Sequence, residues 1–504
     1  MRHSRLGPRL RRVVIYTHRW CGIALGTLFV CWFVSGVVLM YVGMPRLAPA
    51  KRLARRPALN FDAARLTPEV ASQPVRGPVE ALELSMVGGR PVYRFTGRSS
   101  VTGIYADSGQ PVGPITSTLA MVEARSFAPA AAMAMRYDGH VQIPDQWTLE
   151  LARQLPLHRV ALGDAADTRL YVSEATGDIV LETTATSRRW AYPGAILHWI
   201  YLTPIRRHGA AWAQFIIWTS LIGTLMALVG LLWGVWRLSP RAIYRLRRVR
   251  SHSPYARWMW WHHYAGLVFG LATVTWIFSG LLSMDPWDWH PSTTPTASQR
   301  RAFAGSTFSL DGLSIADLQR ALNRLGRPHQ ARITLFGGQR WLATDRGTVP
   351  LEAGPAVLPV DEQTVTPLAG SAIPGAHVTE VTRLTDYDTY YYDRQRELPL
   401  PVFRIRYDDP VRTWLYVDAA RGTVLRKEER LTRLNRWLYH GLHSLDFPFL
   451  YYRRPLWDIT VMVLSAGGLG LSLAAVAPAW QRLRRHLRRL SRSGRHQPPR
   501  GVRQ

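Results

Sequence analysis

The same pattern occurs twice in this sequence, about 245 residues apart, and each copy begins with a histidine beside a long apolar run. The first copy reads HRWCGIALG from His18, and the second reads HHYAGLVFG from His262, a shift of 244; each continues to a Ser-Gly pair. Further along, a Leu-His pair at His198 recurs at His443, a shift of 245. Unrelated helices rarely share such a register. The sequence therefore predicts a duplicated unit of two helices with a domain between them.

Four apolar stretches of the 504-residue chain each exceed the roughly 20 residues that a helix needs to cross a membrane. The predicted fold class is an α+β membrane protein with four transmembrane helices, arranged as two repeated pairs that each enclose an outer α+β loop domain. The predicted helices span 13–44, 211–236, 258–284 and 456–480. The predicted domains between and beside them are the basic N-terminus 1–12, the outer domains 45–210 and 285–455, the basic loop 237–257 and the basic tail 481–504.

The net charge of +29 comes largely from arginines at the N-terminus, in the loop 237–257 and in the tail. In a four-helix topology these three segments lie on one side, which the positive-inside rule assigns to the cytoplasm. Both termini are therefore expected to be cytoplasmic and both large loops to face outward. Basic segments at such positions are typical of contact with a lipid bilayer, and no nucleic-acid partner is expected.

Both outer loops are predicted to contain short strands and helices. Residues 170–180 and 415–425 match at a shift of 245, and each reads as two β-runs around a glycine turn, which predicts a hairpin. Helices are predicted near these hairpins at 117–124 and 315–325. Each loop should therefore hold two small modules of a helix and a hairpin.

On a helix, His18, Gly22 and Gly26 share one face, and so do their counterparts in the second copy, His262, Gly266 and Gly270. Glycine at such a position allows a partner helix to approach closely, or a flat macrocycle to lie against the backbone, and the sequence leaves both alternatives open. A histidine at membrane depth is costly and is usually functional. The recurring histidines are therefore candidate metal or haem ligands.

Depth separates the histidines into two pairs. His18 and His262 begin outward-going helices, near the cytoplasmic face, whereas His198 and His443 precede inward-going helices, near the outer face. We predict two bis-histidine b-type haems, with iron held by His18 and His262 in one and by His198 and His443 in the other. Pairing within one copy fits less well, because those partners are separated by most of the ~30 Å core.

Two further histidines leave the assignment of the iron ligands open. His263 adjoins His262, and His440 lies three residues before His443, where it could replace or support that ligand. Four further histidines are expected in loops as ordinary polar residues: His140, His208, His252 and His290. Seven arginines are candidates to pair with haem propionates, or else to extend to the membrane surface: Arg19, Arg189, Arg206, Arg207, Arg436, Arg453 and Arg454.

The sequence contains no dinucleotide-binding GxGxxG or phosphate-binding GxxxxGK[ST] in a strand–helix context, and no HExxH. No flavin, NAD or zinc site is therefore expected, and electrons would come from a separate, unidentified donor. Cys21 and Cys31 are the only cysteines, and they form no CxxCH motif. Any haem would be held by ligation and packing alone.

Several motifs together resemble the PepSY-associated transmembrane helix family: the repeated hairpins, His-Arg-Trp at the start of a helix, Leu-His before the next helix, Pro144–Thr148, and the acidic and aromatic run Asp386–Asp393. The resemblance covers nearly the whole chain before about Trp480. It implies a multi-pass protein of the bacterial inner membrane with periplasmic PepSY modules, and some members are similar to haem-containing reductases of ferric siderophores.

The expected function is accordingly transmembrane electron transfer through two haems, with reduction of a periplasmic ferric-siderophore or other metal complex. Two alternatives remain: a non-enzymatic module that binds peptides or regulates a peptidase, and a structural accessory subunit of a transport system. The run Asp386–Asp393 is either a contact for a ferric chelate or peptide, or a half-exposed strand whose tyrosines pack on the sheet.

Overall fold

The chain packs as two units in the computed structural model. The described residues are 7–97, 100–241, 244–246, 249–352 and 360–493. The helical unit comprises Met1–Gly43, Trp190–Trp289 and Asn435–Gln504, and the mixed unit of helices and strands comprises Met44–Arg189 and His290–Leu434. The predicted basic ends, 1–12 and 481–504, lie partly outside the described residues, at 1–6 and 494–504.

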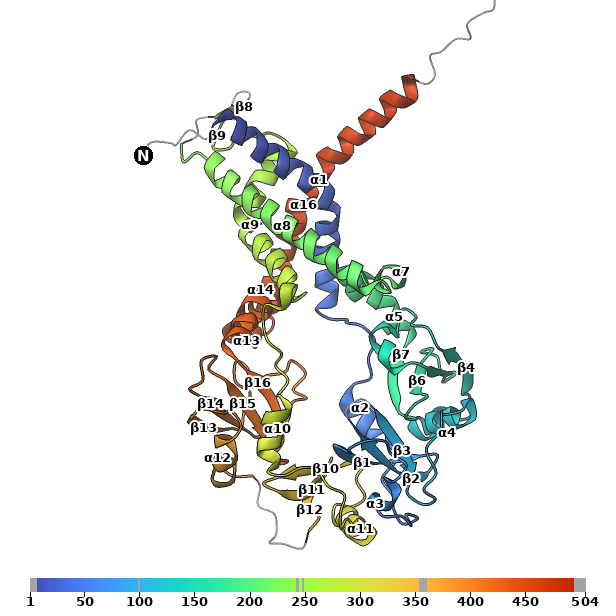
Figure 1. Cartoon of the computed structure of the whole chain (residues 1–504). Coiled ribbons are helices and arrows are strands. Elements are labelled where there is room, and N and C mark those ends of the chain that lie inside the picture. Colours follow the sequence, from blue (N-terminus) through green and yellow to red (C-terminus); the bar gives the residue numbers. More distant parts are fainter. Residues whose placement is uncertain (1–6, 98–99, 242–243, 247–248, 353–359, 494–504) are drawn as a thin grey trace, which may run out of the picture. The chain divides into compact units, whose positions relative to one another are not determined.

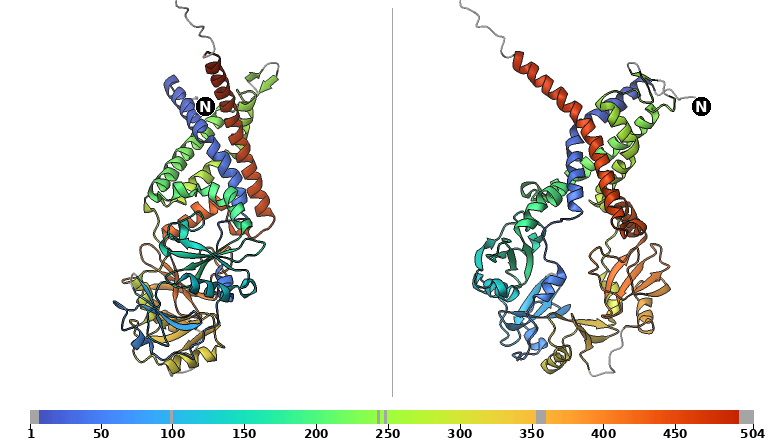
Figure 2. Two further views of the ribbon diagram at one scale, coloured as in Figure 1. Left: turned by 90° about the vertical axis from the view of Figure 1, so that its right-hand side faces the viewer. Right: turned by 180° about the vertical axis from the view of Figure 1, so that it is seen from behind.

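Four long helices form the core of the helical unit, and by length and composition each is apolar enough to cross a membrane. They are α1 (Pro8–Leu39), α8 (Gly209–Arg237), α9 (Trp258–Leu282) and α16 (Leu456–Ser493). Both α1 and α9 pack against α8 and against α16, so the order around the bundle is α1, α8, α9, α16 (Figures 1 and 2). Helices α1 and α9 therefore face each other across a diagonal.

The ends of two long helices differ from the predicted bounds. Helix α1 begins at Pro8 instead of 13, because proline suits the first turn, where its missing N–H has no helical partner. It ends at Leu39, before the predicted 44. Helix α16 continues past 480 to Ser493, since the arginines and leucines of this segment favour helix. The basic loop between α8 and α9 contains a short pair of strands, β8 (Tyr244–Leu246) and β9 (Val249–Ser251).

A run of short helices precedes each of α8 and α16, and both runs include a π-helical turn, a rare geometry that is frequent at functional sites. Residues 190–210 and 435–455 were expected in the outer domains but pack with the helical unit. One reason is that Trp212 and Trp457 of the long helices donate indole hydrogen bonds to the carbonyls of Trp199 and Ser444, at 3.1 and 2.9 Å. The two runs are α5 (Ala185–Ala191), η3 (Tyr192–Ile196), α6 (Leu197–Trp199), α7 (Thr203–Arg206), and α13 (Arg430–Asn435), η5 (Arg436–Gly441), α14 (Leu442–Ser444), α15 (Pro448–Tyr451).

The mixed unit contains a six-stranded antiparallel sheet to which both halves of the chain contribute. Its order is β12-β11-β10-β1-β2-β3. Strands β1 and β10 pair at its centre, where Glu83 lies opposite Arg332, and Leu82, Leu84 and Ile333 beside them are buried in the core. The strands are β1 (Ala81–Val87), β2 (Arg90–Thr96), β3 (Val101–Tyr105), β10 (Ala331–Phe336), β11 (Gln339–Thr344) and β12 (Gly347–Pro350).

Two four-stranded sheets complete the mixed unit, with orders β4-β5-β6-β7 and β13-β14-β15-β16. Helix α4 (Ser117–Phe127) covers the first sheet, and α12 (Glu362–Gly370) packs beside the second. The predicted hairpins at 170–180 and 415–425 are confirmed as β6–β7 and β15–β16. The strands are β4 (Arg136–Val141), β5 (Leu157–Ala161), β6 (Arg169–Ser173), β7 (Ile179–Thr183), β13 (Val378–Leu384), β14 (Val402–Tyr407), β15 (Trp414–Asp418) and β16 (Val424–Glu428).

Short helices connect these sheets. The predicted helix at 315–325 is confirmed as α11 (Ile315–Arg324). The remaining elements are α2 (Pro49–Ala54), α3 (Pro68–Ala71), η1 (Pro129–Ala131), η2 (Leu149–Gln154), η4 (Pro286–Asp288) and α10 (Ala297–Ala304).

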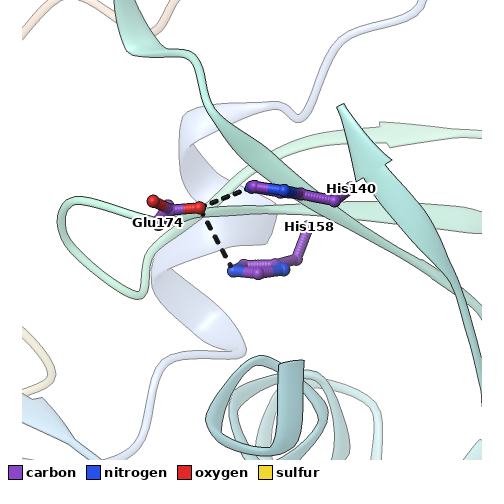
Figure 3. Close-up of side chains that lie close together, drawn as sticks. All are labelled: His140, His158 and Glu174. Carbon is purple, nitrogen blue, oxygen red and sulfur yellow. Dashed lines mark hydrogen bonds and ion pairs between the residues drawn. The ribbon is translucent and has the colours of Figure 1, made fainter. Parts of the chain in front are cut away.

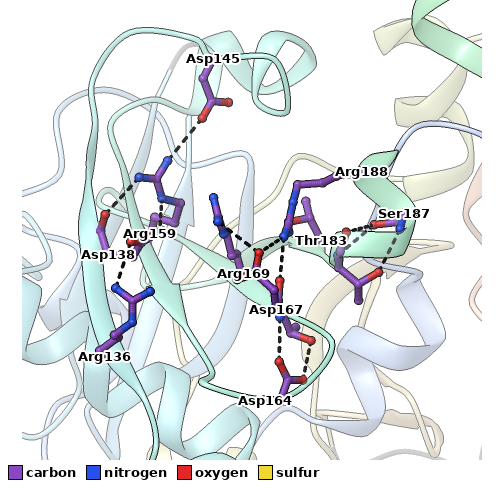
Figure 4. A network of polar contacts seen from close by, with 12 residues as sticks. Arg136, Asp138, Asp145, Arg159, Asp164, Asp167, Arg169, Thr183, Ser187 and Arg188 are labelled. Carbon is purple, nitrogen blue, oxygen red and sulfur yellow. Dashed lines mark hydrogen bonds and ion pairs between the residues drawn. The ribbon is translucent and has the colours of Figure 1, made fainter. Parts of the chain in front are cut away.

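An arginine on the second strand of each four-stranded sheet holds the loop that precedes that strand. Arg159 contacts Asp145 of this loop at 3.6 Å and Asp138 of the neighbouring strand β4 at 2.7 Å (Figure 4), and Arg404 contacts Asp388 of the other loop at 3.0 Å. The run Asp386–Asp393 is thus a loop, and its expectation as a strand was wrong. Tyr391 within it is fully buried, so this side chain serves packing and not an external contact.

Candidate functional site

The rings of His18 on α1 and His262 on α9 lie together across the bundle diagonal. Their centres are 6.2 Å apart, with the planes at 50°. Both side chains are half-buried. Nδ1 of His18 lies 3.0 Å from the carbonyl oxygen of Met226, and Nδ1 of His262 lies 3.2 Å from that of Leu471. Each ring is therefore fixed by the backbone of a flanking long helix.

The rings of His198 on α6 and His443 on α14 form a second pair. Their centres are 6.0 Å apart, with the planes at 67°. Nδ1 of His198 lies 3.1 Å from the hydroxyl of Ser35, and Nδ1 of His443 lies 3.1 Å from that of Ser279. Burial, followed by the effect of the neighbouring His443, lowers the pKa of His198 to about 3, so its imidazole is neutral at neutral pH.

The partners of these rings determine which nitrogen carries the proton. A carbonyl oxygen can only accept a hydrogen bond, so Nδ1 of His18 and of His262 is the protonated nitrogen. Ser35 donates its own proton to the carbonyl of Cys31 at 2.7 Å, which leaves its oxygen to accept from Nδ1 of His198. In each neutral ring the lone pair is then on Nε2, the nitrogen that would bind a metal.

Ser35 and Ser279 were not assigned a role from the sequence, although the Ser-Gly pair recurs in both copies. The adjacent glycines allow the histidine rings to approach closely. A Cβ at Gly36 would lie 3.4 Å from Cε1 of His198, and one at Gly280 would lie 3.6 Å from Cε1 of His443. The repeated Ser-Gly pair was therefore the available signal for these supporting residues.

The four candidate glycines of α1 and α9 all meet a neighbouring long helix. A Cβ at Gly22 would lie 3.6 Å from the Met226 side chain, and one at Gly26 only 2.8 Å from that of Val476. In the second copy, Gly266 faces Leu471 at 3.7 Å and Gly270 faces Leu231 at 3.0 Å. These contacts correspond to the helix-packing alternative, in which small residues bring helices close together.

The two additional histidines near the pairs have different surroundings. His263 is buried, with Nδ1 at 2.8 Å from the Ser253 hydroxyl and Nε2 at 2.8 Å from the carbonyl of Gly234. Through Nε2, His263 joins α9 to α8, and the ring that pairs with that of His18 is that of His262. The ring of His440 lies against Tyr439 at 4.5 Å, and the ring that pairs with His198 is that of His443.

Helix α1 separates the two histidine pairs by a distance comparable to the thickness of a membrane core. Ser35, which contacts His198, follows His18 by 17 residues, or roughly 25 Å of helix. Aromatic side chains lie between them: Phe29 stacks with Trp32 at 5.9 Å, and Phe33 contacts Trp276 at the same distance.

Several of the candidate propionate partners have contacts within the protein. Arg436 is buried and pairs with Asp446 at 3.3 Å, and Arg454 pairs with Asp458. The guanidinium of Arg206 lies over the ring of Trp212 at 4.6 Å, and that of Arg19 over Trp20 at 5.7 Å. The arrangement therefore assigns none of these arginines to an external anion.

One cluster in the mixed unit was missed by the sequence reasoning. His140 was expected in a loop but lies on β4, where it is directly opposite His158 of β5. Glu174, just beyond β6, reaches both rings (Figure 3). These residues are 18 and 16 positions apart, a spacing that matches no short ligand motif, and only the register of the strands brings them together.

The described residues of the helical unit thus present two pairs of imidazoles, each pair spaced closely enough to share one metal ion. The sequence-predicted partners are brought together as His18 with His262 and His198 with His443, and the within-copy pairs are not. Compared with known proteins, the chain matches no family model and no curated protein sequence.

Proposed function

We propose that this chain binds two haem b groups, one between His18 and His262 and one between His198 and His443, and that it transfers electrons across a membrane. The spacing of the rings is the main support. Two imidazoles that share one metal at about 2 Å per bond have ring centres roughly 6 Å apart, since each centre lies about 1 Å behind its nitrogen. The observed separations are 6.2 and 6.0 Å.

The four histidines would hold the two haems through their imidazole rings, one pair to each haem, and the surrounding helices would determine the environment of each group. A bound haem supplies one-electron redox chemistry. Each histidine offers Nε2, while its Nδ1 is held by Met226, Leu471, Ser35 or Ser279, which orients the ring and increases its basicity. The diagonal arrangement of α1 and α9 leaves the two rings of the first pair next to each other, with their planes at 50°.

The proposal includes a topology of two repeated helix pairs, each enclosing a periplasmic PepSY-like domain, in the inner membrane of a bacterium. Both termini would lie in the cytoplasm. The support is a constant offset: α6 and α14, like α7 and α15, begin 245 residues apart, and each of α8 and α16 follows one such run. The arginine-rich loop 237–257 and tail provide the charge asymmetry that sets orientation.

In this topology His198 and His443 lie near the outer face and His18 and His262 near the cytoplasmic face. Electrons from a separate donor would pass to an acceptor in the periplasm, and the resemblance to the PepSY-associated family favours a ferric siderophore or another metal complex. The aromatic side chains of Phe29, Trp32, Phe33 and Trp276 would line the path between the two haems.

The visible spectrum of the purified protein tests this proposal. We expect a Soret band, sharp bands on reduction, and two haem b per chain by pyridine haemochromogen assay. Replacing His18 or His262 with Ala should remove one haem, and replacing His198 or His443 should remove the other. The matched control is His263→Gln, which changes a neighbouring histidine with both nitrogens engaged and should retain two. A colourless protein from haem-replete cells would contradict the proposal and favour a peptide-binding module.

A further inference from the structure

We propose that His140, His158 and Glu174 form a binding site for a divalent transition-metal cation of the zinc class. This site is independent of the haem proposal, because all three residues belong to the mixed unit. Nε2 of His140 lies 2.5 Å from Oε2 of Glu174, and Nε2 of His158 lies 3.7 Å from the same oxygen. One ligand atom from each residue lies within 4.8 Å of the other two.

The distances match a metal site after small movements of the side chains. Zinc binds nitrogen and oxygen at 2.0–2.2 Å, so the donors of a tetrahedral site are about 3.3 Å apart. The contact of His140 with Glu174 must lengthen, and that of His158 with Glu174 must shorten, each by less than about 1 Å. The ligand atoms of the two histidines, which lie within 4.8 Å of each other, must approach by about 1.5 Å at most. The register of the strands already holds the rings in place, since His140 and His158 are cross-strand partners with ring centres 4.8 Å apart and planes at 16° (Figure 3).

The neighbours of both rings can support the tautomer that a metal requires. In the structure His158 donates from Nε2 to the carbonyl of Ile115 at 2.6 Å, and its Nδ1 accepts from the hydroxyl of Tyr137 at 2.9 Å. When Nε2 binds a metal, the ring proton is on Nδ1. The Tyr137 hydroxyl can then accept a hydrogen bond from this N–H, because a hydroxyl both donates and accepts. The side-chain amide of Gln142 lies 3.2 Å from Nδ1 of His140, and it can offer this nitrogen either its N–H₂ as a donor or its oxygen as an acceptor.

The four-stranded topology does not require these three residue types. In the corresponding sheet of the second half, Phe403 stands 245 residues after His158, and its cross-strand partner is Arg383. Ala419 stands 245 residues after Glu174. The same four-stranded topology therefore forms with a hydrophobic residue, an arginine and an alanine, none of which binds a cation.

The exposure of two of the three side chains allows a cation and water to reach the site from solvent. The side chain of His158 is 6% exposed, whereas those of His140 and Glu174 are 32% and 22% exposed. Three protein ligands with one open position are typical of zinc sites that retain a water.

Equilibrium dialysis of the full-length protein against zinc, with bound metal measured by mass spectrometry, tests this inference. We expect the wild type to bind one more zinc ion per chain than His140→Gln or Glu174→Gln. The Tyr137→Phe variant should bind this ion roughly 10–100-fold more weakly, as is usual when a supporting partner is lost. The matched control is His377→Gln, which removes an exposed histidine paired with Asp408 at 3.2 Å, and no third ligand joins this pair among the described residues.

Thermal unfolding provides a second measurement that does not depend on counting other zinc sites. Zinc should raise the Tm of the wild type and of His377→Gln, but not that of Glu174→Gln, because a ligand stabilises only the state that binds it. Equal zinc binding by the wild type, His140→Gln and Glu174→Gln would overturn the proposal and leave the cluster as a structural ion pair. If His140→Gln fails to fold, zinc binding by the wild type is compared with that of Glu174→Gln alone, and equal binding by these two proteins overturns the proposal.

Discussion

The hydroxyl of Ser35 lies 3.1 Å from Nδ1 of His198, although the two residues are 163 positions apart in the chain. The same relationship joins Ser279 to His443, also at 3.1 Å. Each serine thus links a long helix to the short helix that carries a candidate ligand. The contact recurs in both halves, which makes it the most direct place to test whether these rings are held for ligation.

Replacing Ser35 with Ala removes the acceptor for Nδ1 of His198. We expect the Ser35→Ala variant to bind haem at the His198–His443 pair roughly 10–100-fold more weakly, with the other haem unaffected. Haem retained after incubation with a haem-scavenging apoprotein, measured from the Soret band, gives the result. Ser465→Ala, at a buried serine of α16, is the control. Equal retention by the two variants would show that Ser35 does not support a ligand.

The ion pair of Arg436 with Asp446 is buried in the second run of short helices, with side chains 5% and 3% exposed. Removing one partner of a buried pair leaves an uncompensated charge and costs about 3–5 kcal/mol. We therefore expect Asp446→Asn to lower the Tm of the purified protein markedly. The control is Asp458→Asn, whose partner Arg454 is half-exposed, and which should change the Tm little. Similar Tm values for both variants would contradict this prediction.

Asp178 should make the mixed unit sensitive to acid. Burial alone would raise the pKa of Asp178, but Arg94 and Arg56, at 2.7 and 2.9 Å, hold this pKa below its usual value. A lowered folded-state pKa means that the stabilisation is present above the unfolded pKa of about 3.9 and is lost as the pH falls through the folded value.

The matching experiment compares the Tm of the wild type and Asp178→Asn from neutral pH down to the acid range. The wild type should be more stable at neutral pH, and the difference should shrink below about pH 4. The control is Asp62→Asn, which removes an exposed pair with Arg327 and should give a small difference at every pH. A difference for Asp178→Asn that grows as the pH falls would reverse the assigned sign.

The proposed orientation predicts which positions a membrane-impermeant thiol reagent reaches in cells with a permeable outer membrane. In a variant without Cys21 and Cys31, Ala175→Cys and Ala420→Cys should react from outside, because both are exposed residues of the mixed unit. Arg241→Cys, in the basic loop, should react only after the inner membrane is broken. Labelling in the opposite order would place the mixed unit in the cytoplasm.

The repeated register predicted which histidine rings lie side by side, because residues at equivalent positions of the two copies were expected to meet. The register did not predict the hydrogen-bond partners of the histidine Nδ1 atoms. Met226 is 208 residues from His18, and its carbonyl becomes available only through the way α8 crosses α1. The packing of residues 190–210 with the helical unit was not evident from the sequence for a similar reason, since these residues are a mixture of polar and aromatic side chains whose packing partners lie on distant helices.

The cluster at His140 shows a second limit. Short-range patterns detect ligands that share one helix or one turn, whereas these ligands lie on β4, on β5 and beyond β6. Their meeting depends on strand register, which the sequence around each residue does not reveal. His140 in isolation resembled an ordinary surface histidine.

The pairing of β1 with β10 has a consequence for any attempt to divide the protein. A fragment that ends before α9 would keep β1 but lose its neighbour, so a row of backbone donors and acceptors would be left open. Such a fragment would tend to associate with a second molecule through that edge, and its oligomeric state would then depend on its concentration. In the intact chain β1 and β10 belong to one molecule, so their pairing does not depend on the protein concentration.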